Sequence, residues 1–204
     1  MLEGKNIVVF DCEIENDVAG EVTWDRKDLM GFSVGCLFDY FTGDWGVYFK
    51  EDIQSLANRL NEADLVVGFN ILGFDNALIR AQGGNLWPDE DLNCYDLLEY
   101  SRKSIGWTPA QRFPKGMRLD DHLSATFGSS FMKTEDGALA PKMWRDGRHG
   151  EVVTYCLADV RREKTLFEHV VNHGWAKTAT HGQRQFDLSK VNAITQPNNL
   201  ASLI

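Results

Sequence analysis

The sequence lacks the cysteine pairs that build structural zinc sites. Its four cysteines, Cys12, Cys36, Cys94 and Cys156, are widely spaced, and no two of them form a C-x-x-C pair. A zinc site built from cysteines is therefore not expected. Reduced and buried thiols are typical of proteins inside cells, so the cysteines favour an intracellular, cytoplasmic protein.

Long hydrophobic runs and nucleotide-binding loops are also missing. No apolar run approaches the roughly 20 residues that a membrane-spanning helix needs, so we expect no membrane partner. The polar start of the chain, Met1–Asn6, does not have the pattern of a secretory signal peptide. There is neither a G-x-G-x-x-G loop after a strand nor a Walker sequence, which disfavours a nucleotide-hydrolysing motor.

An excess of positive charge is missing as well. The formal net charge is −9, which argues against a protein that coats nucleic acid with a broad basic surface. Residues 101–119 depart from this balance, because they contain five basic side chains together with Trp107 and Phe113 and no acidic residue. Basic groups neutralise phosphates and aromatic rings stack on unpaired bases. The stretch is therefore a candidate nucleic-acid contact, and a solvated structural loop is the alternative.

The apolar residues that are present predict one α/β domain. With 204 residues, 43% of them hydrophobic, the chain is long enough for one well-buried core. We assign the domain to residues 1–173 and treat residues 174–204 as a C-terminal extension with at most a hairpin. Strands are predicted at 6–13, 31–39, 45–50, 65–69 and 92–96. Helices are predicted at 51–61, 74–82, 97–100, 120–127 and 151–172 and near Lys142, with loops at 101–119 and over most of 129–150. This order gives a mixed sheet with helices on its faces.

Four acidic residues stand where a metal site would need them. Asp11 and Glu13 end the first strand, and they share one face because side chains alternate, with Cα atoms roughly 6.6–6.8 Å apart. Asp75 opens a predicted helix, and Tyr155 and Asp159 share one face of the long helix. Each has a plain structural explanation, such as a strand end in solvent or a stabilised helix N-terminus. Their joint occurrence in this order is the informative signal.

These residues resemble the motifs of the DEDD superfamily of 3′–5′ exonucleases, which includes the proofreading exonucleases of DNA polymerases. The first motif, D-x-E after a hydrophobic strand, matches Phe10–Glu13, and the second, an asparagine before an F-D step, matches Asn70–Asp75. The third motif matches Tyr155–Asp159 in its Y-x-x-x-D form, since Thr154 stands where the other form needs histidine. The chain departs from the pattern at Ile14, where a small polar residue is common. The resemblance covers most of the chain. Within the superfamily, the chain resembles the tyrosine branch.

The resemblance implies an α/β fold with a ribonuclease H-like mixed five-stranded sheet flanked by helices. It also implies a phosphodiester hydrolase that uses two Mg²⁺ or Mn²⁺ ions. Asp11 would bridge both ions, and Glu13 and Asp159 would complete the site of the attacking water. Asp75 would support the second ion, and Tyr155 would orient the water through its hydroxyl group.

The expected partner is a nucleic acid with a free 3′ end, with single-stranded DNA favoured and RNA left open, and a polymerase or another replication or repair protein beside it. Two other functions stay open: a non-catalytic nucleic-acid-binding module, and a ribonuclease H-like endonuclease or resolvase. The expected nucleic-acid contacts are Cys12, Ile14, Asn70, Phe74, Trp107, Arg112, Lys115 and Arg118.

Overall fold

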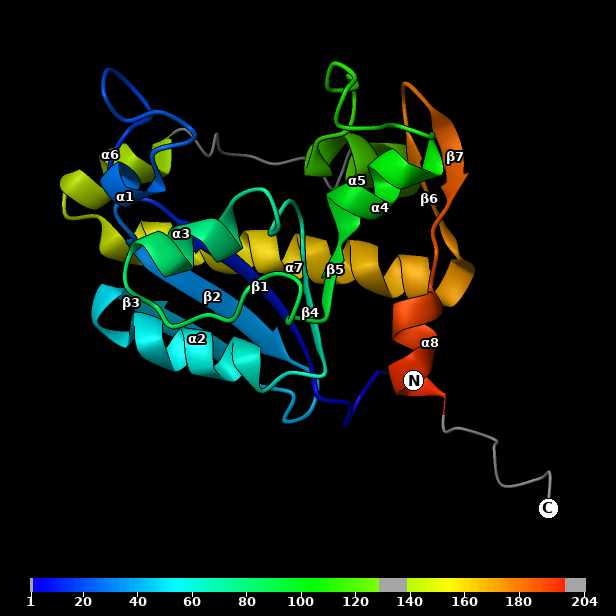
Figure 1. The fold of residues 1–204 in the computed structure, drawn as a ribbon, viewed down its shortest axis with the longest axis horizontal. Coiled ribbons are helices and arrows are strands. Elements are labelled where there is room, and N and C mark those ends of the chain that lie inside the picture. Colours follow the sequence, from blue (N-terminus) through cyan, green and yellow to red (C-terminus); the bar gives the residue numbers. More distant parts are fainter. Residues whose placement is uncertain (1, 129–138, 197–204) are drawn as a thin grey trace.

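The centre of the fold is an apolar strand near the start of the chain. The computed structural model of the protein describes residues 2–128 and 139–196, and in it this strand is β1 (Ile7–Glu13). Its first four side chains, from Ile7 to Phe10, are fully buried. Their β-branched and aromatic shapes fit a pleated surface that is covered on both faces, which explains why this segment forms an interior strand (Figure 1).

Five strands form one mixed sheet around β1. The other four are β2 (Val34–Asp39), β3 (Trp45–Phe49), β4 (Leu65–Gly68) and β5 (Cys94–Asp96). Their order is β3-β2-β1-β4-β5. β1 pairs antiparallel with β2 and β2 pairs antiparallel with β3, while β4 runs parallel to β1 and β5. The predicted five-stranded mixed sheet is confirmed.

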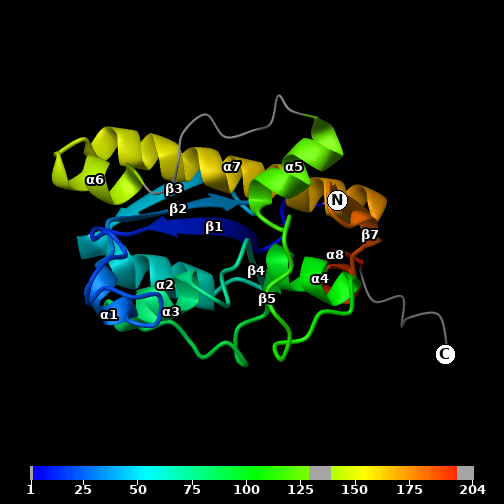
Figure 2. The ribbon, with the colours of Figure 1, turned by 90° about the horizontal axis from the view of Figure 1, so that it is seen from above.

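Helices cover both faces of this sheet. They are α1 (Lys27–Met30), α2 (Ile53–Asn61), α3 (Asp75–Ala81), α4 (Leu97–Ser104), α5 (Leu119–Phe127), α6 (Ala140–Arg145), α7 (His149–His173) and α8 (Ser189–Thr195), with a 3₁₀ turn at Lys50–Asp52. The long helix α7 lies on one face of β1 and β2, and α1, α2 and α3 lie on the other (Figure 2). Within the part of the chain that the structure describes, no helix has both the length and the apolar character needed to cross a membrane.

The alternation of side chains along β1 decides which layer each residue joins. Ile7 and Val9 belong to the core under α7, whereas Val8 and Phe10 belong to the core shared with α2 and α3. Asp11, two residues beyond Val9, therefore continues the side that faces α7. This register brings the acidic end of the strand toward the long helix.

The helices differ from the sequence prediction at three places. α4 runs on to Ser104, so the first residues of the predicted loop at 101–119 are helical. The short helices α1 and α8 were not predicted, because each has only one fully buried side chain, Met30 and Val191. The helix predicted near Lys142 is confirmed as α6. Residues 129–138 of the predicted loop and residues 197–204 of the predicted extension lie outside the described residues.

The described part of the tail packs on the main core. The predicted hairpin is present as β6 (Trp175–Thr178) and β7 (Gly182–Gln185), which pair antiparallel. Phe186 and Val191, beyond the hairpin, are buried in the core cluster that contains α7. The Tyr95 hydroxyl donates a hydrogen bond of 2.9 Å to the carbonyl oxygen of Asp187. The tail thus helps to cover the sheet near its β5 edge.

Candidate active site

The four predicted carboxylates lie around one cavity of about 850 Å³. Asp11 and Glu13 come from the end of β1, Asp75 from the start of α3, and Asp159 from the middle of α7. More than 140 residues of sequence separate the first acid from the last, yet all four line the same space. The convergence that the motif order predicted is therefore present.

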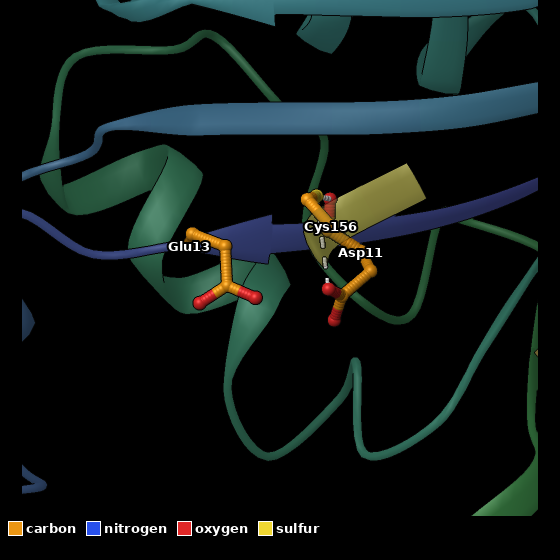
Figure 3. Close-up of side chains that lie close together, drawn as sticks. All are labelled: Asp11, Glu13 and Cys156. Atoms are coloured by element: carbon orange, nitrogen blue, oxygen red, sulfur yellow. Dashed lines mark hydrogen bonds between the residues drawn. The ribbon is translucent and has the colours of Figure 1, made fainter. Parts of the chain in front are cut away.

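Cys156 on α7 contacts Asp11, the first acid of the first motif. Candidate ligand atoms of Asp11, Glu13 and Cys156 all lie within 4.8 Å of one another (Figure 3). The Cys156 thiol points at Asp11, with its sulfur 3.4 Å from the carbonyl oxygen and 3.7 Å from Oδ2. Burial raises the pKa of this thiol well above its usual value, so it stays protonated at neutral pH and acts as a donor. The ligands that remain for a cation are carboxylate oxygens.

The loop of the second motif is held by a carboxylate on the neighbouring strand. Asn70 adopts a positive φ of 69°, and Asp96 at the end of β5 accepts hydrogen bonds from the backbone N–H groups of Asn70 (2.9 Å) and Leu72 (3.0 Å). The same carboxylate caps the N-terminus of α4. Beyond the loop, Asp75 accepts a 3.0 Å bond from the backbone N–H of Cys12. The second carboxylate is thus fastened directly to β1.

The two residues of the third motif, Tyr155 and Asp159, lie in different surroundings. Asp159 is buried and lines the cavity, and its Oδ1 accepts a 2.8 Å hydrogen bond from Arg162 one turn further along α7. Arg162 also forms an ion pair with Asp120 at the start of α5. Tyr155 belongs to the core cluster and is not among the described residues that line the cavity. The role predicted for its hydroxyl group therefore stays a prediction.

A fifth carboxylate that the sequence reasoning missed lies next to this group. Glu163, one turn beyond Asp159, is only 2% exposed, and its Oε2 has no hydrogen-bond partner among the described residues. The backbone N–H of Phe69 donates to the same carboxylate. Burial, and then the carboxylates of Asp75 and Asp159, raises the pKa of Glu163 well above its usual value. The four-residue spacing from Asp159 was the available signal in the sequence.

Burial and mutual repulsion disfavour ionisation of the whole group. Burial first, and then the neighbouring Glu163 and Glu13, raises the pKa of Asp11 well above its usual value. Burial likewise raises the pKa of Asp75 to about 7, although the hydrogen bond from Cys12 opposes the shift. Such a cluster becomes favourable when divalent cations neutralise it. The all-oxygen donor set and the unpartnered buried oxygen of Glu163 both fit hard cations of the Mg²⁺ or Mn²⁺ type.

Comparisons with known proteins bear on the fold. No protein-family model and no curated protein sequence matches the chain. Among solved structures, a similar one is the structure of the family B DNA polymerase from the hyperthermophilic archaeon Pyrobaculum calidifontis, with a TM-score of 0.60 and 19% sequence identity. The fold is ribonuclease H-like. The match covers 81% of this chain and 24% of the polymerase chain, so the likeness concerns about a quarter of that protein and establishes the fold alone.

The eight predicted nucleic-acid contacts of this ribonuclease H-like protein fall into three groups. Those that line the cavity are Cys12, Ile14, Asn70 and Phe74. Trp107 is not part of the lining, but its ring stacks on that of Phe113, which does line the cavity. The remaining three are exposed and lie outside the lining, namely Arg112, Lys115 and Arg118. The sequence reasoning did not single out Trp24 and Lys27, which follow the first motif and also line the cavity.

Proposed function

We propose that the protein is a metal-dependent 3′–5′ exonuclease, which hydrolyses phosphodiester bonds one by one from the 3′ end of a nucleic-acid strand. The observation that carries the proposal is the convergence of four carboxylates from β1, α3 and α7 on one cavity. A binding module has no physical need for such a group, because buried acids are costly unless cations compensate them. Single-stranded DNA is the favoured substrate, with a polymerase or another replication or repair protein as partner.

Under this proposal the carboxylates hold the cations. Asp11, at the centre of the group, would hold the cations together with Glu13 and Asp159 on one side and Asp75 on the other. When bound, two Mg²⁺ or Mn²⁺ ions supply the positive charge that activates the attacking water and stabilises the leaving 3′ oxygen.

Other groups of the chain keep these carboxylates in place. The Cys156 thiol donates to Asp11, the backbone N–H of Cys12 donates to Asp75, and Arg162 donates to Asp159. Each donor limits the rotation of one carboxylate, which lowers the entropy that is lost when a substrate is aligned for in-line attack. Tyr155, four residues before Asp159, orients the attacking water through its hydroxyl group.

Digestion of matched, end-labelled DNA and RNA strands with Mg²⁺ or Mn²⁺ tests the proposal. We expect mononucleotides to be released from the 3′ end, and we expect a circular single strand of the same composition to stay intact. Asp11→Ala and Asp159→Ala are expected to abolish release while circular dichroism shows a folded protein. Asp91→Ala, which changes an exposed acid outside the cavity lining, is the matched control and should keep full activity.

Three results contradict the proposal, and each points to a different function. Cleavage of the circular strand indicates an endonuclease or resolvase. Strand binding without any metal-dependent release indicates a binding module. Full activity of Asp11→Ala or Asp159→Ala shows that the acidic cavity is not the site of hydrolysis.

A further inference from the structure

The two edges of the central sheet differ in how they are protected. β5, at one edge, has three residues, all of them buried, and Lys190 in the tail donates a 3.1 Å hydrogen bond to the carbonyl oxygen of Cys94. β3, at the other edge, has five residues, none of them charged and none of them proline, and two of its apolar side chains are exposed. Natural proteins usually shield such an edge, because its unpaired backbone groups are a template for another strand. The open edge of β3 therefore suits a partner strand.

We propose that two copies of this chain pair through their β3 strands, antiparallel and around a two-fold axis at Val47. Such an interface is isologous, because both copies contribute the same surface. It joins the two five-stranded sheets into one continuous sheet. Among the described residues that line the acidic cavity, none belongs to β3, so the inference is independent of the proposed function.

The backbone of β3 has the hydrogen-bonding pattern that this pairing needs. Across the turn between β2 and β3, the N–H group of Asp39 donates a 3.0 Å bond to the carbonyl oxygen of Asp44. Bonded and non-bonded pairs alternate along an antiparallel ladder, and the register of the two strands puts Trp45, Val47 and Phe49 at the non-bonded positions. Their N–H groups therefore point away from β2. No hydrogen bond between described residues uses the outward groups of Trp45 or Val47, so these groups can bind a second strand.

The charges that flank β3 select one register for the two copies. When Val47 lies opposite its counterpart, Asp44 of one copy lies opposite Lys50 of the other, and the two-fold axis repeats this pair at the other end. Asp44 and Lys50 are both exposed, and opposite charges that face each other across a strand pair are stabilising. A shift of the register by two residues places Asp44 opposite Tyr48 or Asp52 instead, and the favourable pair is lost. The edge is therefore complementary in charge to a second copy of itself.

The same register brings aromatic side chains together. Trp45, Val47 and Phe49 share one face of β3 because side chains alternate along a strand, and Phe49 packs against the core cluster that contains α7. Trp45 is 40% exposed and Val47 is 38% exposed. In the pair, Trp45 of one copy lies opposite Phe49 of the other, whose ring contacts Trp144 with centroids 6.3 Å apart. Aromatic cross-strand pairs stabilise a sheet. Pairing therefore covers apolar side chains that the single chain leaves exposed.

Sedimentation velocity of the full chain tests the inference. We expect the dimer fraction to rise with protein concentration, with a dissociation constant on the order of 10 μM, because contact through one strand and its flanking side chains is smaller than a standard interface. Val47→Pro removes an outward N–H donor and leaves the bonds to β2 intact. This variant should weaken dimerisation about 10-fold or more. A wild-type chain that stays monomeric up to ~1 mM overturns the inference.

Exchanging the flanking charges tests the register. Asp44→Lys and Lys50→Asp each place like charges opposite each other at both ends, and each should weaken self-association about 5- to 100-fold. An equimolar mixture of the two variants has opposite charges at both ends again, so a heterodimer should form with nearly wild-type affinity. Lys50→Asp also loses a 3.0 Å ion pair with Glu15, and the mixture separates this loss from the effect on pairing. Asp91→Lys, the same charge change at an exposed acid just before β5, is the matched control and should dimerise like the wild type.

The mixture of charge variants decides the question even if Val47→Pro fails to fold. A heterodimer that forms only when both variants are present supports pairing through β3 in the stated register. A mixture that stays monomeric, or a dimer that both charge variants leave unchanged, overturns the inference. A monomeric chain that adds an extended peptide along β3 overturns it as well, because the edge then takes a different partner.

Discussion

Replacing Asp75 by asparagine is expected to stabilise the protein against unfolding when no divalent cation is present. The carboxyl group of Asp75 is buried, and burial raises its pKa from an ordinary value of 3.8 to about 7. Asparagine has nearly the same shape and keeps an oxygen that can accept the hydrogen bond from the backbone N–H of Cys12. The substitution therefore removes the cost of a buried charge and leaves the geometry of the loop in place.

The size and the pH dependence follow from the shift of the Asp75 pKa. The difference between 3.8 and about 7 is about 3 units, and each unit corresponds to 1.36 kcal/mol. Because the folded state keeps a proton that the unfolded state has released, the contribution of Asp75 to stability falls as the pH rises from about 4 to 7 and then levels off. Asp75→Asn should therefore gain ~4 kcal/mol at pH 8 and almost nothing near pH 4.

Thermal unfolding followed by circular dichroism in EDTA measures this gain. For a chain of this length, ~4 kcal/mol raises the melting temperature by about 8–16 °C at pH 8. The exposed Asp91→Asn variant is the matched control and should unfold with the wild type. Added Mg²⁺ should raise the melting temperature of the wild type more than that of Asp75→Asn, because the proposed function makes Asp75 a ligand that the variant lacks. If Asp75→Asn unfolds at or below the wild-type temperature in EDTA at pH 8, the electrostatic reasoning is wrong.

Two further substitutions separate catalysis from packing. Tyr155→Phe is expected to slow nucleotide release about 10²-fold and leave Mn²⁺ affinity, measured by calorimetry, unchanged; a large drop in melting temperature without a rate effect would assign the hydroxyl to the core instead. Arg59→Ala breaks hydrogen bonds to Asp39 and Asn6 at 2.8 and 3.0 Å, so urea unfolding should show a loss of about 2 kcal/mol. An unchanged midpoint would mean that this ion pair contributes nothing.

The apolar segments made most of the fold predictable. β1 and α7 carry long patterns of buried side chains, and such patterns determine both the type of element and the face that it buries. α8 could not be predicted in this way, because Val191 is its one fully buried residue and its helical form depends on packing against the core. The extension of α4 to Ser104 could not be predicted for a similar reason. Tyr100 and Ser101 are buried by tertiary packing, which the local sequence pattern does not show.

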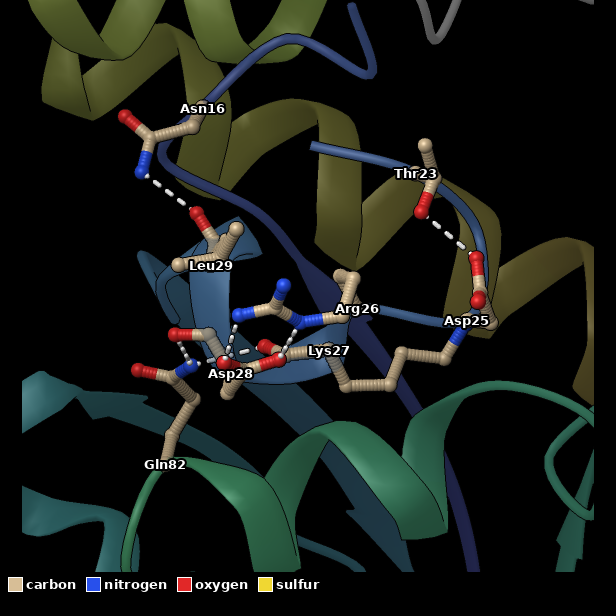
Figure 4. A network of polar contacts seen from close by, with 8 residues as sticks. All are labelled: Asn16, Thr23, Asp25, Arg26, Lys27, Asp28, Leu29 and Gln82. Carbon is tan, nitrogen blue, oxygen red and sulfur yellow. Dashed lines mark hydrogen bonds and ion pairs between the residues drawn. The ribbon is translucent and has the colours of Figure 1, made fainter. Parts of the chain in front are cut away.

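The candidate site was predictable where it depends on sequence order, and it was not where it depends on packing. Asp11 and Asp75 stand in recognisable motifs, so their convergence could be expected before the structure was known. Trp24 lies in an irregular loop whose position depends on hydrogen bonds from Gln82 (Figure 4), and no periodicity reports those bonds. Glu163 appears in the sequence as one acid among many on α7, and only its burial distinguishes it.

Asp96 has a consequence for the order in which the protein folds. Its carboxylate accepts the backbone N–H groups of Asn70 and Leu72, which precede it by 26 and 24 residues. Until β5 pairs with β4, these groups lack that acceptor, and the turn that leads to Asp75 is not held in its native form. Contacts between distant residues close later than local ones, because the entropy of the intervening chain opposes them. A nascent chain in which only β1, β2 and β3 are paired does not yet hold the complete group of four carboxylates, because Asp75 and Asp159 lie beyond these strands in the sequence.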